Sequence, residues 1–202
     1  MLRGEAQRQA LVDAAGRIIQ SEGPHALSVR RLADAVGTST QAVYTHFGGK
    51  EGVVRAMYLE GFARLAAAMQ GVVPSDDPVA DLLDLGRAYR FAARTSPHLY
   101  DIMFGRAVPE FECTDADRAE SLESFVCLLD GVQRAIDAGH LTAESPEAVA
   151  GHLWIVVHGA VSLELAGYLQ PGDTGPDGLD GAYEVTLRWA VSPFLPAGAR
   201  RG

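Results

Sequence analysis

Apolar residues recur at spacings of three and four along most of this 202-residue chain, in segments separated by proline and glycine. This spacing places the apolar side chains on one face of an α-helix. The separating residues cluster at positions 22–25, 47–52, 71–78 and 171–178. No segment alternates apolar and polar residues between two turn signals, as a half-buried strand would. The pattern therefore predicts an all-α protein.

The pattern predicts about nine helices, whose ends are marked by serine caps and by glycine or proline. Ser28, Ser39 and Ser145 each stand where a helix should begin, and Gly37 stands where one should end. The expected helices span residues 5–21, 29–36, 40–47, 50–69, 77–95, 97–106, 115–138, 146–169 and 179–192. We expect a three-helix head at residues 1–49 and a larger helical domain at residues 50–202. Residues 50–69 would form the linking helix.

The most specific signal lies in residues 28–46, where two short helices are joined by a turn that contains Gly37. This is the pattern of a helix-turn-helix. The second helix carries hydrogen-bonding, uncharged side chains over most of its surface: Thr40, Gln41, Tyr44, Thr45 and His46. Such groups can bond to base edges in a DNA major groove, and no acid is present to repel phosphate. The alternative is a connector helix with a solvated polar face.

The charge distribution favours the same end of the chain. The net charge is −9, yet residues 1–55 carry seven Arg or Lys side chains against five Asp or Glu and are therefore at +2. Only this head could attract a polyanion. Lys50 is the only lysine. Its ammonium group opposes the dipole at the start of the expected helix 50–69, unless it faces a phosphate.

The stretch from Leu32 to Glu51, with Val-Tyr-x-His-Phe-x-x-Lys-Glu at residues 43–51, resembles the DNA-binding domain of the tetracycline-repressor (TetR) family. The resemblance covers residues 5–60. Gly48 and Gly49 stand where this family often has proline or a small polar residue. Thr38 replaces a small apolar residue in the turn.

The resemblance implies a role in DNA binding for these residues: Ser28, Arg30, Ser39, Thr40, Gln41, Tyr44, Thr45, His46 and Lys50. Thr40, Gln41 and Thr45 would touch base edges. Ser28, Arg30 and Lys50 would reach phosphate or an outer base. Tyr44 and His46 would contact the sugar-phosphate backbone or brace the head. Their alternatives are packing of Tyr44 against the first helix and a capping or core role for His46.

The body contains Trp154 and His158 on one helical face, followed by Gly159. This segment resembles the Trp-His-Gly type of C-terminal domain in the same family, although here three residues separate Trp154 from His158. The resemblance implies a homodimer formed through the last two helices. The apolar side chains Tyr183, Leu187, Trp189 and Phe194 fit burial between subunits.

The family resemblance also implies an effector pocket inside the body. The candidates are aromatic, Met and His side chains: Phe91, Tyr100, Met103, Phe104, Phe125, Trp154 and His158. They suit a largely apolar effector with few polar anchors. The alternative for each is ordinary core packing.

The sequence contains no motif that indicates an enzyme, a metal-binding protein or a membrane protein. We find no catalytic motif, no metal site and no sign of a cofactor. Cys127 lies in an apolar helix and is expected to be inert, whereas a redox role for Cys113 is an alternative. No apolar run approaches the roughly 20 residues of a membrane span, and the N-terminus lacks a signal-peptide pattern. We therefore expect a cytoplasmic protein with no membrane partner.

These features predict a homodimeric regulator, most simply a repressor, that binds a palindromic DNA operator and is released by a small-molecule effector. One alternative is a helical small-molecule carrier with little DNA affinity. A second is an enzyme without a known motif, whose turnover would not require residues 1–55.

Overall fold

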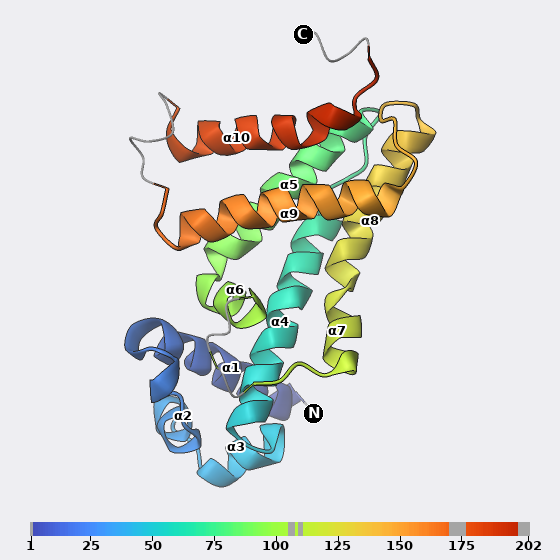
Figure 1. Cartoon of the computed structure of the whole chain (residues 1–202). Coiled ribbons are helices and arrows are strands. Elements are labelled where there is room, and N and C mark those ends of the chain that lie inside the picture. The colour runs from blue at the N-terminus through green and yellow to red at the C-terminus, as the bar shows by residue number, and fades with distance from the viewer. Residues whose placement is uncertain (1, 105–107, 109–110, 170–176, 198–202) are drawn as a thin grey trace. The chain divides into compact units, whose positions relative to one another are not determined.

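The computed structural model describes residues 2–104, 108, 111–169 and 177–197. Within them the chain forms ten α-helices, two short 3-10 turns and no β-strand (Figure 1), which confirms the all-α prediction. The α-helices are α1 (Leu2–Glu22), α2 (Val29–Val36), α3 (Thr40–Phe47), α4 (Lys50–Gln70), α5 (Pro78–Thr95), α6 (Pro97–Phe104), α7 (Asp115–Ser121), α8 (Glu123–Asp137), α9 (Pro146–Leu165) and α10 (Gly178–Val191). The 3-10 turns span Pro24–Ala26 and Ser192–Phe194.

The chain divides into two compact units. Unit 1 comprises residues 1–63 and 96–121, and unit 2 comprises residues 64–95 and 122–202. The helix α4 therefore contributes its first two-thirds to unit 1 and its last turns to unit 2. The proposed boundary at residue 49 remains a prediction.

Unit 1 is built on a core that joins α1, α2, α3, α4 and α6. Leu11, Ala15, Val43, Val54 and Met57 are completely excluded from solvent there. Burial of each large apolar side chain, such as Leu11 or Met57, contributes about 1.5–3 kcal/mol to folding. This contribution far exceeds the intrinsic stability of helices as short as α2 and α3. Packing on α1 and α4 therefore holds the two short helices in place.

The caps around the short helices match the sequence. The Ser28 hydroxyl accepts a hydrogen bond from the Arg31 backbone amide at 3.1 Å, and the Ser39 hydroxyl accepts one from the Ala42 amide at 3.2 Å. Gly37 ends α2 in the left-handed conformation, with φ 70°. The expected helix-turn-helix is therefore present.

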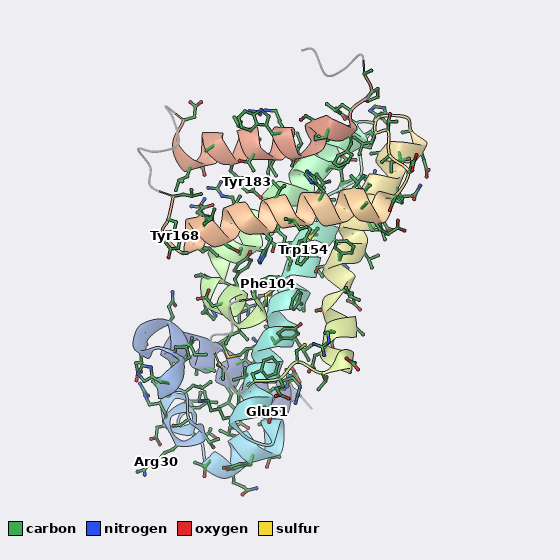
Figure 2. All side chains as sticks on the ribbon, viewed as in Figure 1. Arg30, Glu51, Phe104, Trp154, Tyr168 and Tyr183 are labelled. Carbon is green, nitrogen blue, oxygen red and sulfur yellow. The ribbon has the colours of Figure 1, made fainter. Side chains whose placement is uncertain are left out.

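Unit 2 is a bundle in which α8 and α9 pack on α5, and α10 lies beside α9 (Figure 1). Gly86 on α5 permits a close approach of α10, because a Cβ atom there would collide with the Leu187 side chain. The Tyr183 hydroxyl donates a hydrogen bond to the Gly86 carbonyl at 2.7 Å. Tyr183 points from α10 into the bundle (Figure 2).

Two expected helices end differently in the structure. The prediction of one helix over 115–138 is wrong, because α7 stops at Ser121 and α8 starts at Glu123. At this break the Ser121 hydroxyl bonds to the Arg118 carbonyl at 2.7 Å, and the Leu122 carbonyl accepts from the Phe125 amide. The helix expected to reach residue 169 ends at Leu165, since Gly167 takes up φ 74° and closes it.

The helix α9 is long and apolar enough to cross a membrane by length and composition, and it is the one such helix in the described part of the chain. Within unit 2, however, it buries Val149, Leu153, Val157 and Val161. Its Glu164 accepts hydrogen bonds at 2.6 and 2.8 Å from the buried guanidinium of Arg90. One face of α9 is therefore packed within unit 2.

Candidate functional site

The helix α3 presents a polar, uncharged face to solvent. Thr40, Gln41, Tyr44 and Thr45 are all exposed on it, whereas Val43 is fully buried behind them. The Thr45 hydroxyl donates to the Gln41 carbonyl at 2.9 Å, so its oxygen stays available as an acceptor. Within the described residues, the Gln41 amide forms no intramolecular hydrogen bond and can offer both a donor and an acceptor. This is the chemistry of a surface that binds adenine edges.

A tight turn fixes where α3 ends and α4 begins. Gly48 and Gly49 have φ values of 72° and 140°, which side-chain-bearing residues rarely adopt. Gly52, in the first turn of α4, lies against the Phe47 carbonyl so closely that a Cβ atom would be 1.7 Å from its oxygen. The sequence indicated the break at 48–49 but not the steric requirement at Gly52.

Two of the predicted phosphate contacts carry charges that are free of acidic partners. Within the described residues, Arg30 and Lys50 form no ion pair, and Arg30 extends away from the head at the start of α2 (Figure 2). In contrast, Arg31 bonds to Glu22 at 2.6 Å, and Arg55 bonds to Asp117 at 3.0 Å. Cations without partners are the ones available to a polyanion.

The two serine candidates, Ser28 and Ser39, have exposed hydroxyl groups that already accept hydrogen bonds as helix caps. A hydroxyl that accepts a hydrogen bond can still donate its own proton. Each serine therefore combines its structural role with a free donor at the start of a helix. Their contact with DNA remains a prediction.

Tyr44 and His46 differ in their surroundings. The Tyr44 side chain is 52% exposed and lies beside Gly49, which leaves about half of its surface available to DNA. His46 is half-buried, and its Nε2 lies 3.0 Å from Oε1 of Gln7 on α1. Nε2 of the Gln7 amide donates to the Thr38 hydroxyl at 3.1 Å. Sequence reasoning missed Gln7, because nothing in the local pattern of α1 marks it.

The body candidates Phe125, Trp154 and His158 lie together in unit 2. The rings of Phe125 and Trp154 meet edge to face at 6.4 Å, and those of Trp154 and His158 are 5.7 Å apart. Nδ1 of His158 is 3.0 Å from the Tyr89 hydroxyl, and its Nε2 is 3.4 Å from the Ser162 hydroxyl. Burial lowers the pKa of His158, so the imidazole is neutral at pH 7. Tyr89 is a member of this cluster that sequence reasoning missed.

The other body candidates comprise three residues of unit 1 and Phe91 of unit 2. Tyr100, Met103 and Phe104 belong to unit 1, where the Phe104 ring packs at 4.9 Å from Tyr100 and at 5.4 Å from Phe62. Phe91 is 68% exposed and therefore does not line an apolar interior. The predicted effector residues are thus distributed over both units.

Phe91 lines an open cleft of about 810 Å³ between α5 and the start of α10. Its other lining residues are mostly charged: Arg87, Arg90, Arg94, Asp177, Asp180 and Glu184. The arginines are already paired, since Arg87 bonds to Glu184 at 2.7 Å and Arg90 to Asp180 at 2.7 Å. This cleft does not suit a largely apolar ligand.

Among the described residues, neither cysteine belongs to a group of side chains that could hold a metal ion. In the regions that the structure describes, no group of three or more His, Cys, Asp or Glu side chains could hold a metal ion. Burial raises the pKa of the Cys127 thiol, which suppresses the reactive thiolate. An inert Cys127 is therefore consistent with its surroundings.

Comparison with known proteins agrees with the geometry of both units. Residues 11–57 match the family described as bacterial regulatory proteins, tetR family. Residues 82–188, more than half of the chain, match the family described as the tetracyclin repressor-like C-terminal domain. The Trp-His-Gly subtype remains a prediction.

Individual relatives are regulators as well. The chain is 39% identical over 59 residues to the HTH-type transcriptional repressor AcnR of Corynebacterium glutamicum, an alignment that covers 29% of this chain and 31% of that protein. It is also 28% identical over 171 residues to the HTH-type transcriptional repressor AcnR of Corynebacterium diphtheriae. That alignment covers 83% of this chain and 84% of that protein.

Solved structures share the fold. A protein of unknown function from Rhodococcus sp. RHA1 superimposes with a TM-score of 0.80 at 23% identity, over 94% of this chain and 96% of that one. The TetR family transcriptional regulator PfmR from Thermus thermophilus superimposes with a TM-score of 0.69 at 18% identity, over 90% and 96%. The chain therefore belongs to the TetR family of DNA-binding transcription regulators, and its activity is regulatory rather than enzymatic.

Proposed function

We propose that this protein is a cytoplasmic homodimeric repressor that binds a palindromic operator and is released by a small, largely apolar effector. The observation that carries the proposal is the exposed face of α3. Its free Gln41 amide and Thr40 hydroxyl carry no charge. Arg30 and Lys50, which have no acidic partner in the described residues, add positive charge at the starts of α2 and α4.

Each subunit would insert one α3 into a major groove. The two copies of α3 in a dimer would then bind half-sites about 34 Å apart, or a multiple of that distance. Uncharged groups on α3 would read base edges. Arg30 and Lys50 would bind phosphates, which strengthens binding to any sequence and makes it dependent on salt.

The exposed apolar side chains of α9 and α10 support a dimer through these helices. Ile155 and Leu163, two turns apart on α9, are exposed, and Trp189 on α10 is 73% exposed. Gly151 and Gly159 leave open space on α9, which would let a second helix approach closely. Tyr183 and Leu187 are buried within the subunit itself, so Trp189 is the aromatic side chain that α10 would offer to a partner.

Sedimentation velocity tests this interface. Ile155→Glu places a charge on the proposed contact and should convert a dimer to monomers, because an unpaired charge is costly to bury. Val73→Glu is the matched control, since Val73 is exposed and apolar but lies outside both helices. A dimer that survives Ile155→Glu and Trp189→Glu would contradict the proposal.

We infer that the effector binds beside His158. The cluster of Phe125, Trp154 and Tyr89 is mainly aromatic, and its polar groups are the imidazole, the indole N–H and two hydroxyl groups. The longer contact, 3.4 Å to Ser162, is the easier one for a ligand group to replace. Binding would be coupled to DNA through α4, the continuous helix that starts at Lys50 and contributes to both units. The effector only needs to prefer the conformation that does not bind DNA.

Fluorescence anisotropy with DNA from just upstream of the protein's own gene tests the function as a whole. Measurements at two salt concentrations, with unrelated DNA as competitor, should reveal tight and salt-dependent binding that resists the competitor. Compounds that release this DNA should quench Trp154 in a Trp189→Phe variant, which retains one tryptophan. Effector binding by a protein with no affinity for any DNA would instead support the carrier alternative.

A further inference from the structure

Gln7 on α1 connects two parts of the helix-turn-helix, which lie 31 and 39 residues away from it in the sequence. Nε2 of Gln7 donates a hydrogen bond to the Thr38 hydroxyl at 3.1 Å. Its Oε1 lies 3.0 Å from Nε2 of His46. Thr38 belongs to the turn just before α3, and His46 belongs to the last turn of α3. The amide therefore holds both ends of this helix.

The helix α3 needs such a connection. It has eight residues, and its buried anchor is Val43, with Phe47 half-buried beside it. One fully buried side chain fixes the position of a short helix but leaves rotation about its own axis poorly restrained. Contacts at both ends of the helix oppose that rotation. The neighbouring residue of α1 adds a contact, since the Arg8 guanidinium lies 5.5 Å from the centre of the Phe47 ring.

We propose that Gln7 is a positioning residue for DNA recognition, which holds α3 in the orientation that presents Gln41 and Thr40 to the bases. This inference rests on the proposed function. Gln7 itself need not touch DNA, because it acts through Thr38 and His46. The bridge also explains Thr38, whose hydroxyl takes the place of the small apolar residue expected in the turn.

The same bridge orients the His46 ring. The Oε1 atom can only accept a hydrogen bond, so Nε2 of His46 carries the proton and points toward α1. In the neutral ring, Nδ1 is then the unprotonated nitrogen. Removal of the Gln7 amide frees the ring to adopt both tautomers, which is a change that a simple loss of packing would not produce.

The effect on DNA binding follows from pre-organisation. Apparent affinity falls in proportion to the fraction of molecules whose binding surface is correctly oriented. Base-edge contacts require this orientation, whereas phosphate contacts from mobile Arg and Lys side chains require it much less. Two neutral hydrogen bonds correspond to roughly a tenfold change in an equilibrium. Loss of Gln7 should therefore weaken specific binding while sparing non-specific binding.

The test uses the full-length protein and a DNA site selected in vitro from a random library. Gln7→Met keeps the length of the side chain and removes both hydrogen bonds. We expect its affinity for the selected site to fall about tenfold, with binding to unrelated DNA within about twofold of the wild type. Gln9→Met is the matched control, because Gln9 lies on the same helix and, within the described residues, bonds only to Asp13 of α1. Gln9→Met should bind like the wild type.

A double-mutant cycle with Thr38→Val tests the bridge itself. If Gln7 acts through Thr38, Gln7→Met should cost less in the Thr38→Val protein than in the wild type, since the partner is already absent. Full additivity of the two losses would contradict the bridge. Thr38→Val also keeps the inference testable if Gln7→Met folds poorly.

The tautomer of His46 gives a readout that does not depend on DNA. Nitrogen–proton correlation spectra of the imidazole rings, recorded near pH 8.5 where imidazoles are neutral, should show His46 as the Nε2-protonated form in the wild type. In Gln7→Met it should become a mixture. Identical His46 spectra and identical site affinity in the two proteins would overturn the inference. A wild-type protein that selects no DNA sequence would instead refute the proposed function.

Discussion

Gly52→Ala is the substitution for which the sequence and the structure make opposite predictions. In the interior of a helix, replacing glycine by alanine stabilises the protein by about 1 kcal/mol through helix propensity alone. At Gly52, however, the new Cβ atom would lie 1.7 Å from the Phe47 carbonyl oxygen and 2.7 Å from its carbon. Ordinary contact begins near 3.4 Å, so the Phe47 peptide would have to move away by about 1.7 Å.

The obstacle cannot rotate aside, because it is backbone at the end of α3 and not a flexible side chain. Phe47 is followed by Gly48 and Gly49, whose positive φ angles already shape the turn. Overpacking of this kind costs about 1–3 kcal/mol or more. Because the clash at 1.7 Å is with backbone, we take the upper end, about 3 kcal/mol. With the propensity gain of about 1 kcal/mol subtracted, we expect a net loss near 2 kcal/mol, which would lower a urea midpoint by about 1 M. Displacement of α3 should also weaken specific DNA binding.

The assay is urea unfolding at one fixed protein concentration, followed by far-ultraviolet circular dichroism. Tryptophan fluorescence serves as a second probe, which follows the unfolding of unit 2, because Trp154 and Trp189 both lie in that unit. Gly4→Ala in α1 is the control, because a Cβ atom added there would meet no other atom within 4 Å. It should be neutral or slightly stabilising. A Gly52→Ala protein as stable as the wild type, with normal DNA affinity, would refute the reasoning.

Three further predictions concern individual side chains. Because burial lowers the pKa of His158, the unfolded chain binds more protons than the folded one once the pH falls below about 6.5, so stability should decline there. His158→Gln should flatten this dependence in urea midpoints measured at pH 8 and pH 5.5, and an unchanged slope would remove His158 as its source. Lys50→Ala should weaken binding to all sequences and reduce the salt slope by about one unit; a slope equal to that of the wild type would exclude a phosphate contact. Gln41→Ala should relax preference at one base pair in each half-site when binding is measured on single-base operator variants, and a uniform loss would argue against base readout.

Much of the head could be predicted because its signals are local. A serine before a helix and a glycine after it act within a few residues, and Ser28, Gly37 and Ser39 all take the expected roles. The exposed polar face of α3 follows directly from helical periodicity once its ends are known. Leu122 shows the limit of this approach, since it separates α7 from α8 inside an otherwise helical pattern.

The body was harder to predict because apolar helical positions have several possible partners. Tyr183, Leu187 and Trp189 look alike in sequence as apolar groups of one helix. Tyr183 and Leu187 are buried against their own subunit, and Trp189 is exposed. Phe91 was an equally reasonable pocket residue, but it lies on a charged cleft. Periodicity identifies a buried stripe without saying which element covers it.

The sequence by itself determined the helical class, the helix-turn-helix and the polar face of its second helix, because these depend on interactions within a few residues. The tertiary structure decided which cations are free, that Gly52 must be glycine, and that Gln7 meets Thr38 and His46. Those features depend on atoms 5 to 39 residues apart in the chain. Their contacts exist only after packing on α1 and α4 has brought the segments together.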